Sequence, residues 1–221
     1  MFNVGFSAEF WAAIAGAIVG GGISMALQLL ANRSAIKVRQ ADAKAQLAAQ
    51  ARSLVLKTVK IESDFLQFRK DLEESRILAQ QNGIPFGWAS FRATANLPRE
   101  IVFTNEEIAA LSACKNDSLF NDVLALDEVH SSVLQIMLLY RSKRFELSDS
   151  LPAQMSGNIG ISSLSPEEFN KLAPKMVEVD LLAKDLASLI EQESSEPMSL
   201  SNRLAAAVND QYGSNMSIEL K

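Results

Sequence analysis

The longest apolar run in the sequence lies near its start, from Phe10 to Ala31, and reads FWAAIAGAIVGGGISMALQLLA. None of these positions carries a formal charge. At a rise of 1.5 Å per residue, such a helix is about 33 Å long, enough to cross a hydrocarbon core of about 30 Å. The pattern therefore predicts a transmembrane helix over residues 10–31, preceded by a short extracytoplasmic segment over residues 1–9.

Basic residues follow this span closely. Seven Lys or Arg lie between Arg33 and Lys60 against a single acid, Asp42, whereas residues 1–9 contain no Lys or Arg. A cleaved signal peptide is disfavoured, because it would have a positive N-terminus and a shorter apolar stretch. Since basic residues stay in the cytoplasm, we expect a retained single-pass anchor, with the N-terminus outside and the rest cytoplasmic. The side chains expected at the lipid headgroups are those of Arg33, Lys37, Arg39 and Lys44.

Small residues recur every four positions within the span. This spacing brings Ala12, Gly16, Gly20 and Ser24 to one face of a helix. A small face lets two membrane helices approach closely, so it predicts self-association or pairing with another membrane protein. The alternative is that glycine is simply common in membrane helices. Three consecutive glycines, each costing a helix about 1 kcal/mol relative to alanine, favour a packing partner.

A long helix is predicted to continue beyond the membrane. No Pro or Gly occurs between Gly22 and Gly83, which predicts one helix from about Ser7 to Gln81. Residues 32–81 form a basic juxtamembrane part and then a stalk, in which apolar residues alternate at spacings of three and four. The stripe either packs against later helices of the same chain, which its Thr and Phe residues favour, or forms a homo-oligomeric coiled coil. Its members are Leu47, Ala51, Leu54, Thr58, Ile61, Phe65, Phe68 and Leu72.

Residues 82–103 interrupt the helical pattern. Gly83, Pro85, Gly87 and Pro98 break the helix, and aromatic residues concentrate between them. These rings either fold over the helical domain or provide a docking surface for a cytoplasmic partner protein. The residues that would form such a surface are Phe86, Trp88, Phe91 and Arg92.

The remaining chain, residues 104–212, reads as further helices. A capping box of Thr104 and Glu107 predicts a short helix to about Lys115. A longer helix is expected over 119–147, then a Ser- and Gly-rich flexible connection over 148–163. Two more helices are expected, from Ser165-Pro166, with a break or kink at Pro174, and over about 199–209; residues 213–221 read as a flexible tail. Only residues 101–103 look β-like. The fold class is therefore all-α: one transmembrane helix that continues into a stalk, and a cytoplasmic antiparallel bundle.

Reactive residues are few. The chain has one cysteine, Cys114, and one histidine, His130. His130 falls on the apolar face of its helix three residues after Asp127, and one His with one carboxylate is too little for a zinc site. We therefore expect a hydrogen-bonded core histidine. No nucleotide-binding, zinc-protease or hydrolase motif occurs, so the sequence predicts no catalytic residue, no cofactor, no metal and no small-molecule substrate.

Charge also argues against nucleic acid as a partner. The net charge is -5, and the basic residues are scattered along one helix while residues 82–221 are acidic. The sequence thus favours a non-enzymatic, membrane-anchored interaction or scaffold protein. Its expected partners are the lipid bilayer, a second copy or another membrane protein, and a cytoplasmic protein. The alternative is a pore-forming or membrane-disrupting effector assembled through the glycine-rich helix; an enzyme acting through Cys114 or His130 is a third, weaker hypothesis.

Overall fold

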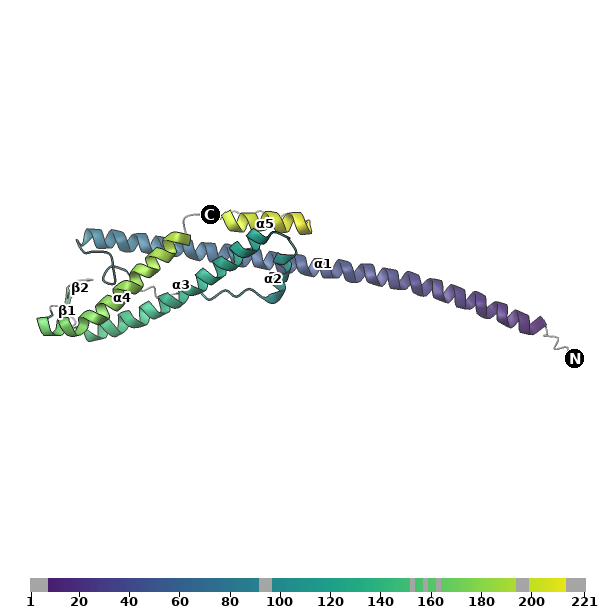
Figure 1. Ribbon diagram of the computed structural model, residues 1–221, viewed down its shortest axis with the longest axis horizontal. Helices are drawn as coiled ribbons and strands as arrows, with labels where there is room; N and C mark the ends of the chain where they lie inside the picture. Colours follow the sequence, from purple (N-terminus) through teal and green to yellow (C-terminus); the bar gives the residue numbers. More distant parts are fainter. Residues whose placement is uncertain are drawn as a thin grey trace. The chain divides into compact units, whose positions relative to one another are not determined.

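The computed structural model describes residues 8–91, 97–151, 154–156, 159–161, 164–193 and 199–213 (Figure 1). These residues form five helices and one pair of short strands. The elements are α1 (Ala8–Gln81), α2 (Asn105–Ser112), α3 (Asp117–Ser150), β1 (Gln154–Ser156), β2 (Ile159–Ile161), α4 (Pro166–Glu193) and α5 (Ser199–Tyr212). The chain divides into two compact units, Met1–Ala49 and Gln50–Lys221.

Helix α1 has 74 residues and matches the long helix expected from the absence of helix breakers. It ends where Gly83 takes the left-handed conformation, with φ +62°. The amide of Ile84 donates to the carbonyl of Ala79 at 3.0 Å, so a carbonyl that would otherwise lack a partner is satisfied beyond the last turn. The proposed N-cap, Ser7, lies outside the described residues.

Capping side chains define the starts of α2 and α3. Thr104 and Glu107 form the predicted capping box at α2. At α3, the side chain of Asn116 accepts a hydrogen bond from the amide of Leu119 at 3.1 Å. The helix that starts at Pro166 runs through Pro174, so of the break or kink expected there the break does not occur.

The small strand pair was not predicted. β1 and β2 are antiparallel, and Met155 is paired with Gly160. Sequence reasoning expected a flexible connection here, because three-residue strands are too short for an alternating pattern to be recognised. Residues 101–103, the only β-like run, do not form a strand.

The second unit contains two hydrophobic clusters. The main core lies between α1, α3 and α4, and its largest buried members include Phe68, Tyr140 and Leu186. The small core joins the start of the stalk to α2, α3 and α5 through residues such as Leu54, Val123 and Leu204. Each stripe residue from Ala51 to Leu72 is buried by its own chain, whereas Leu47 is exposed; the buried members are Ala51, Leu54, Thr58, Ile61, Phe65, Phe68 and Leu72.

Two helices are long and apolar enough, by length and composition, to cross a membrane. One is the stretch Trp11–Gln81, whose most apolar window has a mean hydropathy of 1.8 and is 0% buried within the chain. The other is α3, with a mean hydropathy of 1.3 and 39% of its window buried. The difference in burial separates them, because α3 contributes core residues such as Val133 and Met137 to the bundle.

Candidate functional site

The small-residue face of α1 is exposed. The residues of this face are all solvent-accessible: Ala12, Gly16, Gly20 and Ser24. A Cβ atom built on Gly16 or Gly20 would meet nothing within 4 Å. Because nothing among the described residues needs the room that glycine leaves, contacts within the described part of the chain do not explain this face.

The basic residues after the span are also exposed. Arg33, Lys37, Arg39 and Lys44 are solvent-accessible on α1. At 100° per residue, Arg33, Lys37 and Lys44 lie within about 40° of one another around the helix axis, with Arg39 on another side. At a rise of 1.5 Å per residue, Arg33 lies about 3 Å and Lys44 about 20 Å beyond Ala31 along the helix. If Ala31 ends the span, Arg33 and Lys37 are thus the best placed of the four to contact headgroups.

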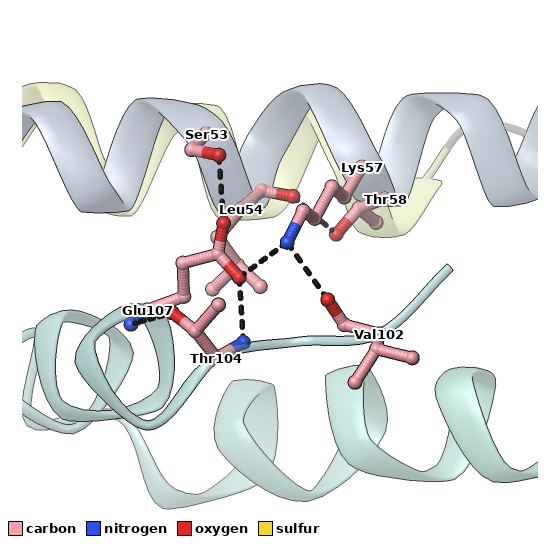
Figure 2. A network of polar contacts seen from close by, with 7 residues as sticks. All are labelled: Ser53, Leu54, Lys57, Thr58, Val102, Thr104 and Glu107. Atoms are coloured by element: carbon pink, nitrogen blue, oxygen red, sulfur yellow. Dashed lines mark hydrogen bonds and ion pairs between the residues drawn. The ribbon is translucent and has the colours of Figure 1, made fainter. Parts of the chain in front are cut away.

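A polar network ties α1 to the start of α2 (Figure 2). The carboxylate of Glu107 accepts hydrogen bonds from Ser53 Oγ and Lys57 Nζ, both at 2.7 Å, and from the amide of Thr104 at 2.8 Å. Lys57 Nζ also donates to the carbonyl of Val102 at 2.7 Å. Burial alone would raise the pKa of Glu107, but the hydrogen bonds from Lys57, Ser53 and Thr104 outweigh it and lower the pKa.

This network has a structural rather than a catalytic arrangement. Ser53 and Lys57 are one turn apart, a spacing at which lysine could act as a base for serine. However, Ser53 donates a hydrogen bond to Glu107, and Lys57 is paired with the same carboxylate and with a carbonyl. The hydrogen bond of the Ser53 hydroxyl thus goes to Glu107 and not to Lys57, so this geometry does not show a lysine that takes a proton from serine.

Thr58 is a buried polar residue on α1 next to this network. Its Oγ1 donates to the carbonyl of Leu54 at 3.0 Å, which satisfies the hydroxyl within the helix itself (Figure 2). Thr58 is fully buried and lies along the helix between the small-core residue Leu54 and the main-core residue Ile61.

His130 is buried, as expected, but its hydrogen bonding differs from the prediction. Its side chain is 0% exposed, and Nε2 lies 3.4 Å from Asp64 Oδ2. Neither ring nitrogen makes a hydrogen bond to the described residues, so the expected hydrogen-bonded state is not observed. Burial would raise the pKa of Asp64, yet its contacts with His130 and Lys60 lower it. Asp127 behaves in the opposite way: burial raises its pKa despite the nearby His130.

The aromatic loop is held against the main core. Phe91 is buried, and Phe86 and Trp88 are partly buried and pack on the same cluster. Tyr140 Oη donates to the carbonyl of Phe91 at 2.6 Å, and Arg144 donates to the same carbonyl. The arrangement corresponds to the interpretation in which the loop folds over the bundle; Arg92 lies outside the described residues.

Sequence reasoning missed two positions that organise the bundle. No motif singles out Tyr140, although its hydroxyl binds the loop. Glu62 is likewise not marked by any motif. It is buried, and its Oε1 accepts a hydrogen bond from the amide of Ser201 at 3.0 Å, in the first turn of α5. The spacing of residues within α3 or α1 carried no signal for either contact, because each pair of partners is distant in sequence.

The described residues offer little reactive chemistry. They contain no group of three or more His, Cys, Asp or Glu side chains that could hold a metal ion. Cys114 is half-buried beside the small core, and burial raises the pKa of its thiol. A raised thiol pKa leaves little thiolate at neutral pH, which is unfavourable for a nucleophile.

Comparison with known proteins identifies no relative. No family model matches the chain, and no curated protein or solved structure shows significant similarity to it.

Proposed function

We propose that this protein is a non-enzymatic, membrane-anchored scaffold. Residues 10–31 cross the bilayer once with the N-terminus outside, and the helical bundle is presented to the cytoplasm. The anchor associates with a second copy or with another membrane protein through Ala12, Gly16, Gly20 and Ser24. Arg33 and Lys37 contact anionic headgroups, with smaller contributions from Arg39 and Lys44, and the bundle binds a cytoplasmic protein.

One observation carries the proposal: the most apolar window of α1 is 0% buried within the chain. Large side chains along it, including Trp11, Met25, Leu27 and Leu30, are each more than half exposed. Burying one such side chain is worth about 1.5–3 kcal/mol, so a row of them left in water would be strongly unfavourable. A bilayer supplies the missing apolar environment without any further protein.

The scaffold role follows from what surrounds the anchor. The second unit has its own cores, so its folding does not rely on residues 10–31. The polar network around Glu107 joins α1 to α2, and its serine, Ser53, donates to the Glu107 carboxylate instead of to a base. We therefore infer that the domain acts by binding. A chain that lacks residues 1–31 is expected to be soluble and helical; an unfolded far-ultraviolet circular dichroism spectrum would reject an independently folded domain.

Self-association is tested by the mass of the full chain in mild detergent, measured by light scattering after size exclusion. The variant Gly16→Leu/Gly20→Leu places two large side chains on the small face without a clash inside the chain, since both positions are open. Gly22→Leu is the matched control. It is equally open, but it lies about 120–160° around the helix axis from Gly16 and Gly20, on another face.

A small oligomer that the double variant dissociates, and that Gly22→Leu leaves intact, supports the scaffold. A monomer that neither variant changes would remove self-association from the proposal and leave a different membrane protein as the partner of the anchor. A large uniform assembly, together with loss of membrane potential on overexpression, would instead favour the pore-forming alternative.

A further inference from the structure

The contact between Asp64 on α1 and His130 on α3 places two titratable groups inside the bundle. Their side chains are 5% and 0% exposed, and Oδ2 of Asp64 lies 3.4 Å from Nε2 of His130. Neither Oδ2 nor either ring nitrogen has a hydrogen-bond partner among the described residues. A buried carboxylate oxygen and a buried imidazole without hydrogen bonds are unfavourable. A proton on the imidazole would let the two groups form a hydrogen bond with each other.

The surroundings of the pair are known from each packed element. On α1, Lys60 Nζ binds the other oxygen of Asp64 at 2.5 Å, and the ring of Phe65 lies 6.0 Å from the imidazole ring. On α3, the half-buried carboxylate of Asp127 interacts electrostatically with His130. Glu100, before α2, and Lys57, on α1, act in turn on Asp127. The buried members that α4 adds to this core are apolar: Val179, Ala183, Leu186, Ala187 and Ile190.

We propose that His130 and Asp64 form a proton-operated latch between α3 and α1, which closes when the imidazole takes up a proton. In the closed state both ring nitrogens carry hydrogen, and Nε2 donates to Oδ2 of Asp64 as a charge-assisted hydrogen bond. Asp64 is suited to this role because its pKa is lowered, so it remains an anion when the imidazole titrates. Histidine is the side chain whose charge changes between about pH 5 and 8, the range in which the latch would operate.

The latch would make the attachment of the stalk helix to the bundle depend on pH. Opening requires only a proton to leave the imidazole, with no change in Lys60 or in the main core. When the pH falls, α1 and α3 gain a buried ion pair and separate less readily. When the pH rises, the contact loses its hydrogen bond while the apolar packing remains.

The only histidine of the chain makes a direct test possible. The full chain in mild detergent, labelled with ¹⁵N-histidine, gives one pair of imidazole nitrogen signals that report protonation. We expect these signals to show the uptake of a proton as the pH is lowered. Asp64→Asn should move its midpoint down by about one to three pH units, because it removes the opposite charge. Glu146→Gln, which changes an exposed carboxylate on the same helix, should leave the midpoint in place.

Lys60→Gln provides a second variant if Asp64→Asn fails to fold, since the Lys60 side chain is 60% exposed. Removing this cation should move the midpoint up. Hydrogen exchange of α3 amides should then follow the titration, and the pH-dependent protection should change by up to about tenfold for each pH unit that the midpoint moves. An imidazole that stays neutral from pH 5 to 8, or a midpoint that neither variant moves, would overturn the latch.

Discussion

Replacing Glu107 by alanine should lower the free energy of unfolding of the bundle by about 3 kcal/mol, a value worked from the contacts it loses. The Glu107 side chain is 2% exposed, and its carboxylate accepts bonds from Lys57, Ser53 and the amide of Thr104. Bonds to a charged group contribute about 1.5–3 kcal/mol each. Lys57 is 29% exposed, so water replaces part of the hydrogen bonding that it loses with Glu107. The total destabilisation is therefore smaller than the sum over the three bonds.

Two acids in the first turn of α2 allow a matched comparison. It separates the stability that comes from the Glu107 network from the stability that any acid contributes near a helix N-terminus. Glu106 lies in the same turn of α2 but is exposed, so Glu106→Ala should cost only about 0.5 kcal/mol. Glu107→Gln should cost about 1–2 kcal/mol, because a glutamine can still accept from the amide of Thr104. A double-mutant cycle of Glu107→Gln with Lys57→Met should give a coupling energy of about 1–2 kcal/mol.

Urea unfolding of the full chain in mild detergent measures these differences. The chain has two tryptophans, so the Trp11→Phe background leaves Trp88, which packs on the main core, as the fluorescent reporter of the bundle. The slope of the transition should be the same for all variants, so that shifts in midpoint report stability. Equal midpoints for Glu107→Ala and Glu106→Ala would refute the role assigned to the network.

Three further predictions concern the same domain. Leu54→Ala should destabilise it by about 2–5 kcal/mol, because it leaves a cavity in the small core, whereas Leu56→Ala, at a position 68% exposed, should cost less than about 0.5 kcal/mol in the same urea assay. Thr104→Ala should cost about 1 kcal/mol through loss of the cap, and no loss would contradict the capping box. The pKa of Glu107 is lowered from 4.5, so its contribution to the free energy of unfolding is fully present above about pH 5 and is lost as the pH falls through the folded-state pKa. The urea midpoint of the unchanged protein should therefore fall below about pH 5. In Glu107→Gln this fall should be smaller.

Local signals in the sequence were sufficient for most of the helical fold. The absence of Pro and Gly between Gly22 and Gly83 predicted the extent of α1, and Thr104 with Glu107 predicted where α2 begins. Caps and breakers act over a few residues, so they can be read from one segment alone. The break expected as one possibility at Pro174 does not occur, because the loss of one hydrogen bond is a local cost that packing of α4 through Val179 and Ile190 offsets.

Contacts across long separations could not be predicted in this way. The pattern along α1 showed that Phe65 and Leu72 share a face. It gave no indication that polar side chains of the same helix reach α2, α3 and α5. Glu107 lies 54 residues from Ser53, and Ser201 lies 139 residues from Glu62. The buried pair of Asp64 and His130 was missed for the same reason, because Asp127 appeared as the nearest carboxylate in sequence.

Labelling of single cysteines in intact cells tests the membrane anchor most directly. One variant keeps Cys114 as the only cysteine, and a second carries Asn3→Cys with Cys114→Ser. Both are treated with a membrane-impermeant maleimide before and after lysis under denaturing conditions. The account predicts that the protein stays with the membrane fraction, that residue 3 is labelled in intact cells, and that Cys114 is labelled only after lysis. Labelling of Cys114 in intact cells, or recovery of the full chain in the soluble fraction, would contradict it.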